Sequence, residues 1–297
     1  MKGQRKILIA FLLNLGFSIF EFLGGWLTGS VSILSDALHD MGDAAGIGLS
    51  WLLEKKSMHR PDSLYTYGYG RYSVLGSLVI TLFLLLGSVL NICNALWRIF
   101  RPVPIRYDGM IPLAVIGVCV NLTAALVTAQ GESLNRKAVN LHMLEDVLGW
   151  VVVLVGAVVM RFTDLVILDP LMSVGVALFI LIQAVKNLRE SLSVFLEKAP
   201  EDMDVQELKV QLCTLEGVAD VRHIHLWSID GIHACATMHL VVRGDARKIK
   251  EAVRRELTLL GIGHATLEVE TEGEHCCGSQ CGILSETTPH HHCHHRH

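Results

Sequence analysis

Two histidine–aspartate pairs stand out in the sequence because each lies inside a run of apolar residues. His39 and Asp43 form the first pair, and His142 and Asp146 repeat its four-residue spacing. On a helix, this spacing places both side chains on one face, one turn apart. Two imidazoles and two carboxylates offer nitrogen and oxygen ligands that suit a divalent transition metal. The four residues therefore predict a metal site.

The chain around these pairs is apolar enough to lie in a membrane. Of its 297 residues 51% are hydrophobic, and the mean hydropathy is +0.45. This apolarity comes mostly before about residue 190, in long blocks that contain both pairs. Since a charged side chain near the centre of a bilayer costs about 2.5–3.5 kcal/mol, the pairs need a function that explains them. We infer movement of a metal ion across a membrane.

Six apolar segments are candidates for membrane helices, because a bilayer core takes about 20 residues of helix. They lie near residues 7–28, 31–53, 74–98, 109–130, 139–160 and 165–185. The second segment carries the first histidine–aspartate pair, and the fifth carries the second pair. Lysine and arginine are more frequent in the loops that share a side with the N-terminus, which predicts that both termini lie in the cytosol.

After Pro200 the sequence changes to the pattern of a soluble domain. Apolar periodicity predicts a helix, two strands, a helix and a strand at 203–216, 219–229, 232–242, 245–260 and 264–270. This αββαβ order is typical of a small two-layer α+β domain. We therefore expect a membrane domain over residues 1–199 and a cytosolic domain over residues 200–272.

A second candidate metal site combines this cytosolic domain with the tail that follows it. Residues 273–297 lack periodicity and are rich in cysteine and histidine, so we expect a flexible tail. In a reducing compartment, clustered cysteines favour metal binding over disulfides, and thiolate and imidazole are strong zinc ligands. The candidate ligands are His225, His239, Glu270, Cys276, Cys277 and Cys281.

Short motifs occur along the chain in an order that is typical of one family. They lie at residues 35–43, 67–71, 135–146, 169–170, 196–200 and 223–227, reading SDALHDMGD, YGYGR, NRKAVNLHMLED, DP, LEKAP and HIHLW. Together they resemble the cation diffusion facilitator family, and within it the zinc-transporting branch. The resemblance extends from about residue 7 to residue 272.

The resemblance implies six membrane helices, a metallochaperone-like cytosolic domain and a homodimer that exports Zn²⁺ from the cytoplasm in exchange for protons. It assigns the transport site to His39, Asp43, His142 and Asp146. It also implies a multi-pass protein in the bacterial inner membrane, surrounded by lipid. Cd²⁺ and Co²⁺ are further candidate substrates, since they tolerate similar ligands. In zinc-branch relatives, positions similar to the cytosolic cluster bind metal at the dimer interface, so Zn²⁺ is also a candidate regulatory ion.

The loop between the second and third segments departs from part of the family. Some members place an aspartate, a histidine and a Gly-His-Gly sequence there as another zinc site. This chain has Asp62, Tyr65 and Tyr69 at the matching positions. Because tyrosine is a poor zinc ligand, we do not expect that site here.

Other classes of function fit the sequence less well. An intramembrane metalloenzyme would need an open metal position and a general base, as in the motif His-Glu-x-x-His, which this sequence lacks. A membrane-anchored zinc sensor would leave the buried histidine–aspartate pairs unexplained. A nucleic-acid partner is not expected, because the formal net charge is −4 and no basic stripe with interleaved aromatic residues occurs.

Overall fold

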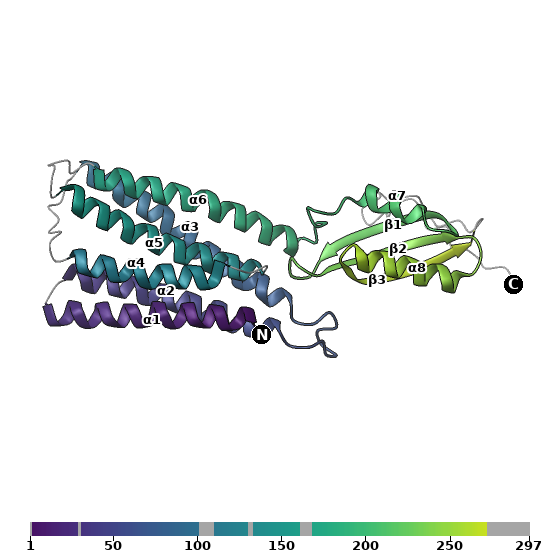
Figure 1. Cartoon of the computed structure of the whole chain (residues 1–297), viewed down its shortest axis with the longest axis horizontal. Helices are drawn as coiled ribbons and strands as arrows, with labels where there is room; N and C mark the ends of the chain where they lie inside the picture. The colour runs from purple at the N-terminus through teal and green to yellow at the C-terminus, as the bar shows by residue number, and fades with distance from the viewer. Residues whose placement is uncertain (1, 29–30, 101–109, 130–132, 161–167, 272–297) are drawn as a thin grey trace, which may run out of the picture. The chain divides into compact units, whose positions relative to one another are not determined.

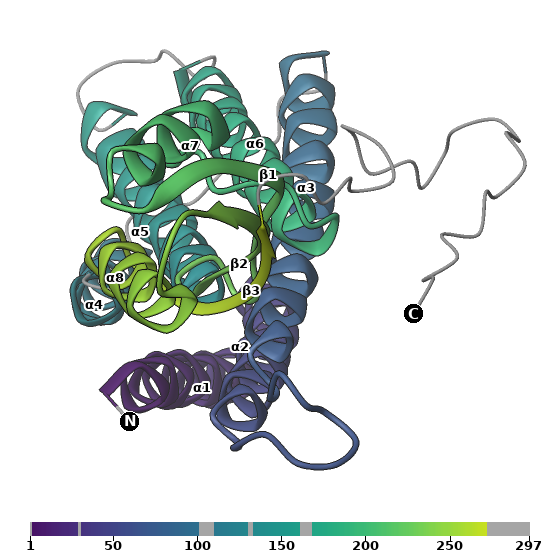
Figure 2. The same ribbon diagram turned by 90° about the vertical axis from the view of Figure 1, so that its right-hand side faces the viewer.

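The computed structural model describes residues 2–28, 31–100, 110–129, 133–160 and 168–271. Contacts divide the chain into one unit of residues 1–198 and 228–232 and another of residues 199–227 and 233–297. The first unit contains the long helices α1 (Lys2–Thr28), α2 (Val31–Ser57), α3 (Arg71–Phe100), α4 (Met110–Ala129), α5 (Leu134–Met160) and α6 (Leu168–Phe195). In this bundle α1 packs along α2, α3 along α6 and α4 along α5 (Figures 1 and 2).

The helical unit has the composition of a membrane domain. Among the described residues, Gln4–Gly24, Arg71–Trp97 and Leu134–Gly156 are long and apolar enough to cross a membrane, and Ala114–Ala129 is a shorter apolar helix. Large apolar side chains such as Leu86 are exposed on the bundle, as expected for a surface that faces lipid. A helical membrane-type domain is therefore confirmed, whereas the expected number of six spans stays a prediction.

Helix α6 continues to Phe195, beyond the end at residue 185 that hydropathy predicted. Its extension packs through polar contacts rather than apolar ones. The Asn187 amide is buried and donates to the hydroxyl groups of Ser77 (3.1 Å) and Thr81 (2.5 Å) on α3. Hydropathy could not predict this extension because hydrogen bonds between helices hold it in place.

Aromatic packing fixes how α1 and α4 approach α5. Trp150 lies on α5, and its ring crosses that of Phe17 on α1 edge to face, with centroids 5.6 Å apart. On α4, a Cβ added to Gly117 would lie 2.7 Å from the Trp150 ring, so only glycine lets the helices come this close. Trp150 follows Asp146 by one helical turn, so this packing also positions the second histidine–aspartate pair.

A line of polar residues runs between α2 and α5. Ser50 donates to Oδ1 of Asn135 (2.5 Å), and Nδ2 of Asn135 donates to the Glu54 carboxylate (3.0 Å). Glu54 also accepts from Ser73 on α3 (2.7 Å), so one buried carboxylate joins three helices. Asp43, Ser50 and Glu54 share a face of α2 by their spacing, and this face meets α5.

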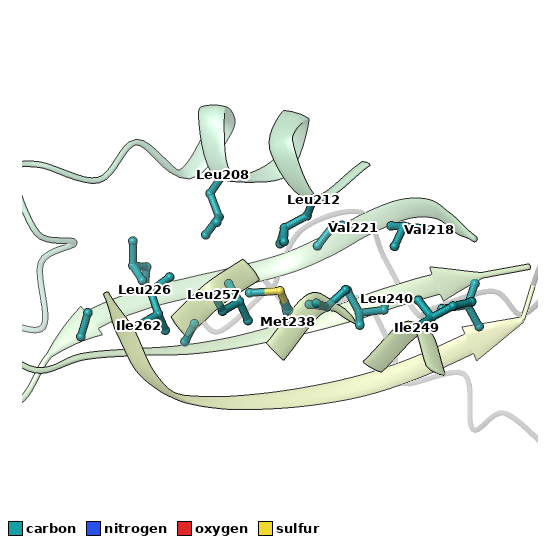
Figure 3. Close-up of a cluster of buried hydrophobic side chains, with 14 residues drawn as sticks. Leu208, Leu212, Val218, Val221, Leu226, Met238, Leu240, Ile249, Leu257 and Ile262 are labelled. Atoms are coloured by element: carbon teal, nitrogen blue, oxygen red, sulfur yellow. The ribbon is translucent and has the colours of Figure 1, made fainter. Parts of the chain in front are cut away.

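The second unit follows the predicted order of elements, with α7 (Val205–Cys213), β1 (Val218–Ser228), β2 (Ala234–Val242), α8 (Ala246–Leu259) and β3 (Ile262–Thr271). The strand order is β1-β2-β3, and β2 and β3 pair in parallel across α8. Both helices and all three strands contribute to one apolar core, in which Leu212, Met238 and Leu257 are almost fully buried (Figure 3). An α+β region is thus confirmed, while its likeness to metallochaperones stays a prediction.

Strand β1 does not alternate regularly, although the sequence predicted that it would. His223 has φ = 46°, in the left-handed region that residues other than glycine rarely adopt. The core-facing positions accordingly shift from Val221 to Ile224 and Leu226, a spacing of three and then two. This irregularity changes which histidine of β1 lies near β2.

We predict that Glu54→Ala destabilises the helical unit. The substitution removes the buried carboxylate to which the Asn135 amide and the Ser73 hydroxyl donate, and each lost hydrogen bond costs about 0.5–1.5 kcal/mol. Thermal unfolding of the detergent-solubilised protein should occur several degrees lower. Glu197→Ala, which removes an exposed ion pair with Arg71, is the control and should change the melting temperature little. Equal melting temperatures for wild type and Glu54→Ala would contradict a structural role for this network.

Candidate metal centre

The structure brings three of the four predicted membrane ligands together. Asp43 on α2 and His142 and Asp146 on α5 each offer one ligand atom, and these atoms lie within 4.8 Å of one another. In the described part of the chain, no other group of three such residues comes this close. The two helices meet here because the four-residue spacing on α5 and the polar face of α2 place these side chains at the same level.

The chemistry of these three side chains fits a divalent cation. Nε2 of His142 and Oδ2 of Asp43 are 3.8 Å apart, which is too far for a hydrogen bond. His142 is 5% exposed, and neither of its ring nitrogens has a hydrogen-bond partner among the residues that the structure describes. A buried imidazole without partners is unfavourable. A cation between the ring and the two carboxylates would supply the missing interaction.

His39, the fourth predicted ligand, lies on α2 one turn before Asp43. Its side chain is outside the described residues. The helical spacing puts His39 on the same face as Asp43. Its part in the site stays a prediction.

Asn14 is a neighbour of the site that was hard to predict from the sequence. Its Nδ2 donates to Oδ2 of Asp146 over 3.3 Å, which brings α1 to the metal centre. The one sign in the sequence was an amide in the middle of an apolar segment. That pattern indicates an inward-facing side chain but does not name its partner.

In the α2–α3 loop, the carboxylate of Asp62 accepts hydrogen bonds from within the loop, including one from a tyrosine. Tyr69 donates its hydroxyl to Oδ2 of Asp62 (2.7 Å), and the backbone N–H groups of Leu64 and Tyr65 donate to Oδ1 (2.9 and 2.8 Å). The hydrogen bond from Tyr69 lowers the pKa of Asp62 and raises the pKa of Tyr69 to about 12. Both carboxylate oxygens are thus engaged by donors, and Lys56 lies 5.2 Å from the Tyr69 ring.

In the second unit, His239 and Glu270 form a close pair. Nδ1 of His239 lies 2.5 Å from Oε1 of Glu270, and its Nε2 lies 3.3 Å from Oε2 of Glu268. Nη1 of Arg222 is 3.9 Å from the other oxygen of Glu270. The His223 ring, rather than that of His225, packs near His239, with centroids 4.9 Å apart.

His225, another predicted cytosolic ligand, is not brought to this pair. His225 is exposed on β1, and within the described residues His225, His239 and Glu270 do not form a group of three at metal-binding distance. Cys276, Cys277 and Cys281 lie outside the described residues. The composition of the cytosolic site therefore stays a prediction.

Comparisons with known proteins find a family of cation transporters. A family model described as the cation efflux transmembrane domain matches residues 7–196. The chain is 33% identical to the zinc transporter ZitB of Yersinia pestis, over 99% of this chain and 96% of the relative. It is 30% identical to the cadmium, cobalt and zinc/H(+)-K(+) antiporter of Bacillus subtilis, over 91% and 90% of the two chains. It is also 30% identical to the metal cation efflux system protein CzcD of Cupriavidus metallidurans, over 90% and 87%.

The extent of these matches decides the family. The family model covers more than half of the chain, and the relatives align along nearly its full length. These relatives are named as transporters and efflux proteins rather than enzymes. The chain is an integral membrane protein that belongs to the cation efflux, or cation diffusion facilitator, family and to its zinc-transporting branch.

Proposed function

We propose that this protein exports Zn²⁺ from the cytoplasm in exchange for protons, through an intramembrane site formed by His39, Asp43, His142 and Asp146. The observation that carries the proposal is the meeting of three of these ligands within 4.8 Å, inside a helical unit of membrane composition. The names of the relatives, which include zinc transporters and an H(+)-coupled antiporter, support the same substrate and the same coupling.

The ligand chemistry explains how protons drive the exchange. A metal binds the ionised carboxylate and the neutral imidazole, so Zn²⁺ and protons compete for the same lone pairs. On the side of higher pH the ligands are free for Zn²⁺. On the acidic side protons take those lone pairs and release the cation, and the protons then leave on the other side.

Exchange requires that the site open to one side at a time. We propose that all six helices span the membrane, with both termini in the cytosol, and that a homodimer in the bacterial inner membrane is the working form. The contacts of Glu54 and Asn135 join α2 to α5 on the same helix faces as the site. These contacts have to rearrange if α2 and α5 separate to let the cation pass.

The cytosolic residues suit a regulatory role. We propose that His239 and Glu270, together with His225 and Cys276, Cys277 and Cys281, bind Zn²⁺ as a signal of its cytosolic level. Both ring nitrogens of His239 face carboxylates, so a cation would replace an existing hydrogen bond. Metal binding there competes with pairing between side chains, which favours reversible binding.

Removing one carboxylate from the membrane site should abolish transport without unfolding the protein. Asp43→Asn and Asp146→Asn keep the side-chain volume but remove a charged ligand, so Zn²⁺ flux into vesicles should fall to background. An internal zinc dye reports the flux. Asp62→Asn is the matched control, because Asp62 is an exposed carboxylate outside the site, and it should transport like wild type. Wild-type flux in both site variants would disprove the assignment.

Proton coupling has its own test. Vesicles with an acidic interior should accumulate Zn²⁺ faster than vesicles without a pH gradient, because interior protons displace the cation from its ligands. A protonophore should remove the difference. If the initial rate is the same with and without a gradient, the protein transports the cation without proton exchange.

The C-terminal tail should affect the rate of Zn²⁺ flux only at low Zn²⁺ concentration. Deleting residues 289–297 removes a histidine-rich stretch whose composition suits collection of the cation. We expect slower flux at low Zn²⁺ and an unchanged maximal rate, measured over a range of Zn²⁺ concentrations in the same vesicles. Loss of flux at saturating Zn²⁺ would show that the tail is part of the transport machinery.

A further inference from the structure

Asn14 lies at the position on α1 where burying a polar side chain is energetically most unfavourable. It lies at the middle of Gln4–Gly24, a stretch long and apolar enough to cross a membrane, and it is 2% exposed. An amide buried among apolar groups is unfavourable unless it is hydrogen-bonded. Its Nδ2 has a partner in Oδ2 of Asp146, but its Oδ1 is buried and has no partner among the described residues. A leucine would avoid this cost, so packing alone does not account for an amide here.

The position of Asn14 is set independently of its hydrogen bond. One turn further along both helices, Phe17 of α1 packs edge to face on Trp150 of α5. Trp150 in turn lies against Gly117 of α4, which holds its ring in place. The aromatic contact therefore helps to hold the Asn14 amide beside Asp146.

The direction of the hydrogen bond follows from the chemistry of the two groups. A carboxylate oxygen accepts and an amide NH₂ donates, and the amide presents its NH₂ group to Asp146. This places the amide oxygen on the far side, in agreement with its lack of a partner. One oxygen of Asp146 is then occupied by Asn14, and only Oδ1 has its lone pairs fully available to a cation.

We propose that Asn14 is a positioning residue that limits Asp146 to coordination through one oxygen and thereby favours Zn²⁺ over larger divalent cations such as Cd²⁺. The inference rests on the proposed transport function. Zn²⁺ takes four ligands at about 2.0–2.2 Å, and one oxygen from each carboxylate completes that set. Larger cations accept more oxygens, including both oxygens of one carboxylate. Without the amide, Asp146 offers both of its oxygens and this restriction is lost.

The test compares Zn²⁺ and Cd²⁺ flux in vesicles that contain the full chain. Removing a group that orients a metal ligand typically costs about 10–100-fold in metal affinity. In Asn14→Leu we expect the KM for Zn²⁺ to rise about tenfold and the KM for Cd²⁺ to rise much less, so the ratio of kcat/KM for Cd²⁺ to that for Zn²⁺ increases. Asn14→Ala should act in the same direction and serves if the leucine variant does not insert. Asn14→Gln keeps an NH₂ group and should lie closer to wild type.

Asn121 provides the matched control. It is an asparagine of α4 that is 1% exposed and has an unpartnered Oδ1, and in the described part of the chain it makes no hydrogen bond to the three ligands. Asn121→Leu should leave the Cd²⁺ to Zn²⁺ ratio unchanged. The inference is overturned if Asn14→Leu and Asn14→Ala keep the wild-type ratio, or if Asn121→Leu shifts it equally. Absence of Zn²⁺ flux in wild type would instead overturn the proposed function.

Discussion

The cost of keeping polar groups away from water constrains the whole helical unit. Each buried polar side chain needs a partner, and in this bundle the partners lie on other helices. Glu54 joins α2 to α3 and α5, Asn187 joins α6 to α3, and Asn14 joins α1 to α5. At the metal centre this pairing is incomplete, because among the described residues neither ring nitrogen of His142 has a hydrogen-bond partner and two carboxylates lie close to it. That deficit is what makes a cation the natural occupant of the site.

The same constraint explains what the sequence could predict. Long apolar segments and a four-residue spacing of histidine and aspartate are local patterns, so they predicted the helical domain and the residues that meet on α2 and α5. The end of α6 and the role of Asn14 depend on which helices are neighbours, and one sequence does not contain that information. The expected residue pattern of β1 failed for a local reason, since His223 adopts a left-handed conformation that its residue type does not signal.

The two proposed metal sites differ in how their side chains contact one another. In the membrane, Nε2 of His142 and Oδ2 of Asp43 are 3.8 Å apart, so a cation would not have to replace a hydrogen bond between them. In the second unit, His239 and Glu270 already form a short hydrogen bond, and Arg222 lies near the same carboxylate. A cation must break this pairing in order to bind. This difference suits a transport site that loads readily and a regulatory site that responds only when the cation is abundant.

The central claim is that Zn²⁺ and protons compete for Asp43, His142 and Asp146. Calorimetric titration of the solubilised protein with Zn²⁺, repeated in buffers of different ionisation enthalpy, measures the protons released for each cation bound. The account predicts that wild type releases protons and that Asp43→Asn releases fewer, because one titrating ligand is missing. Zn²⁺ binding without proton release in wild type, or equal release in the variant, would contradict it.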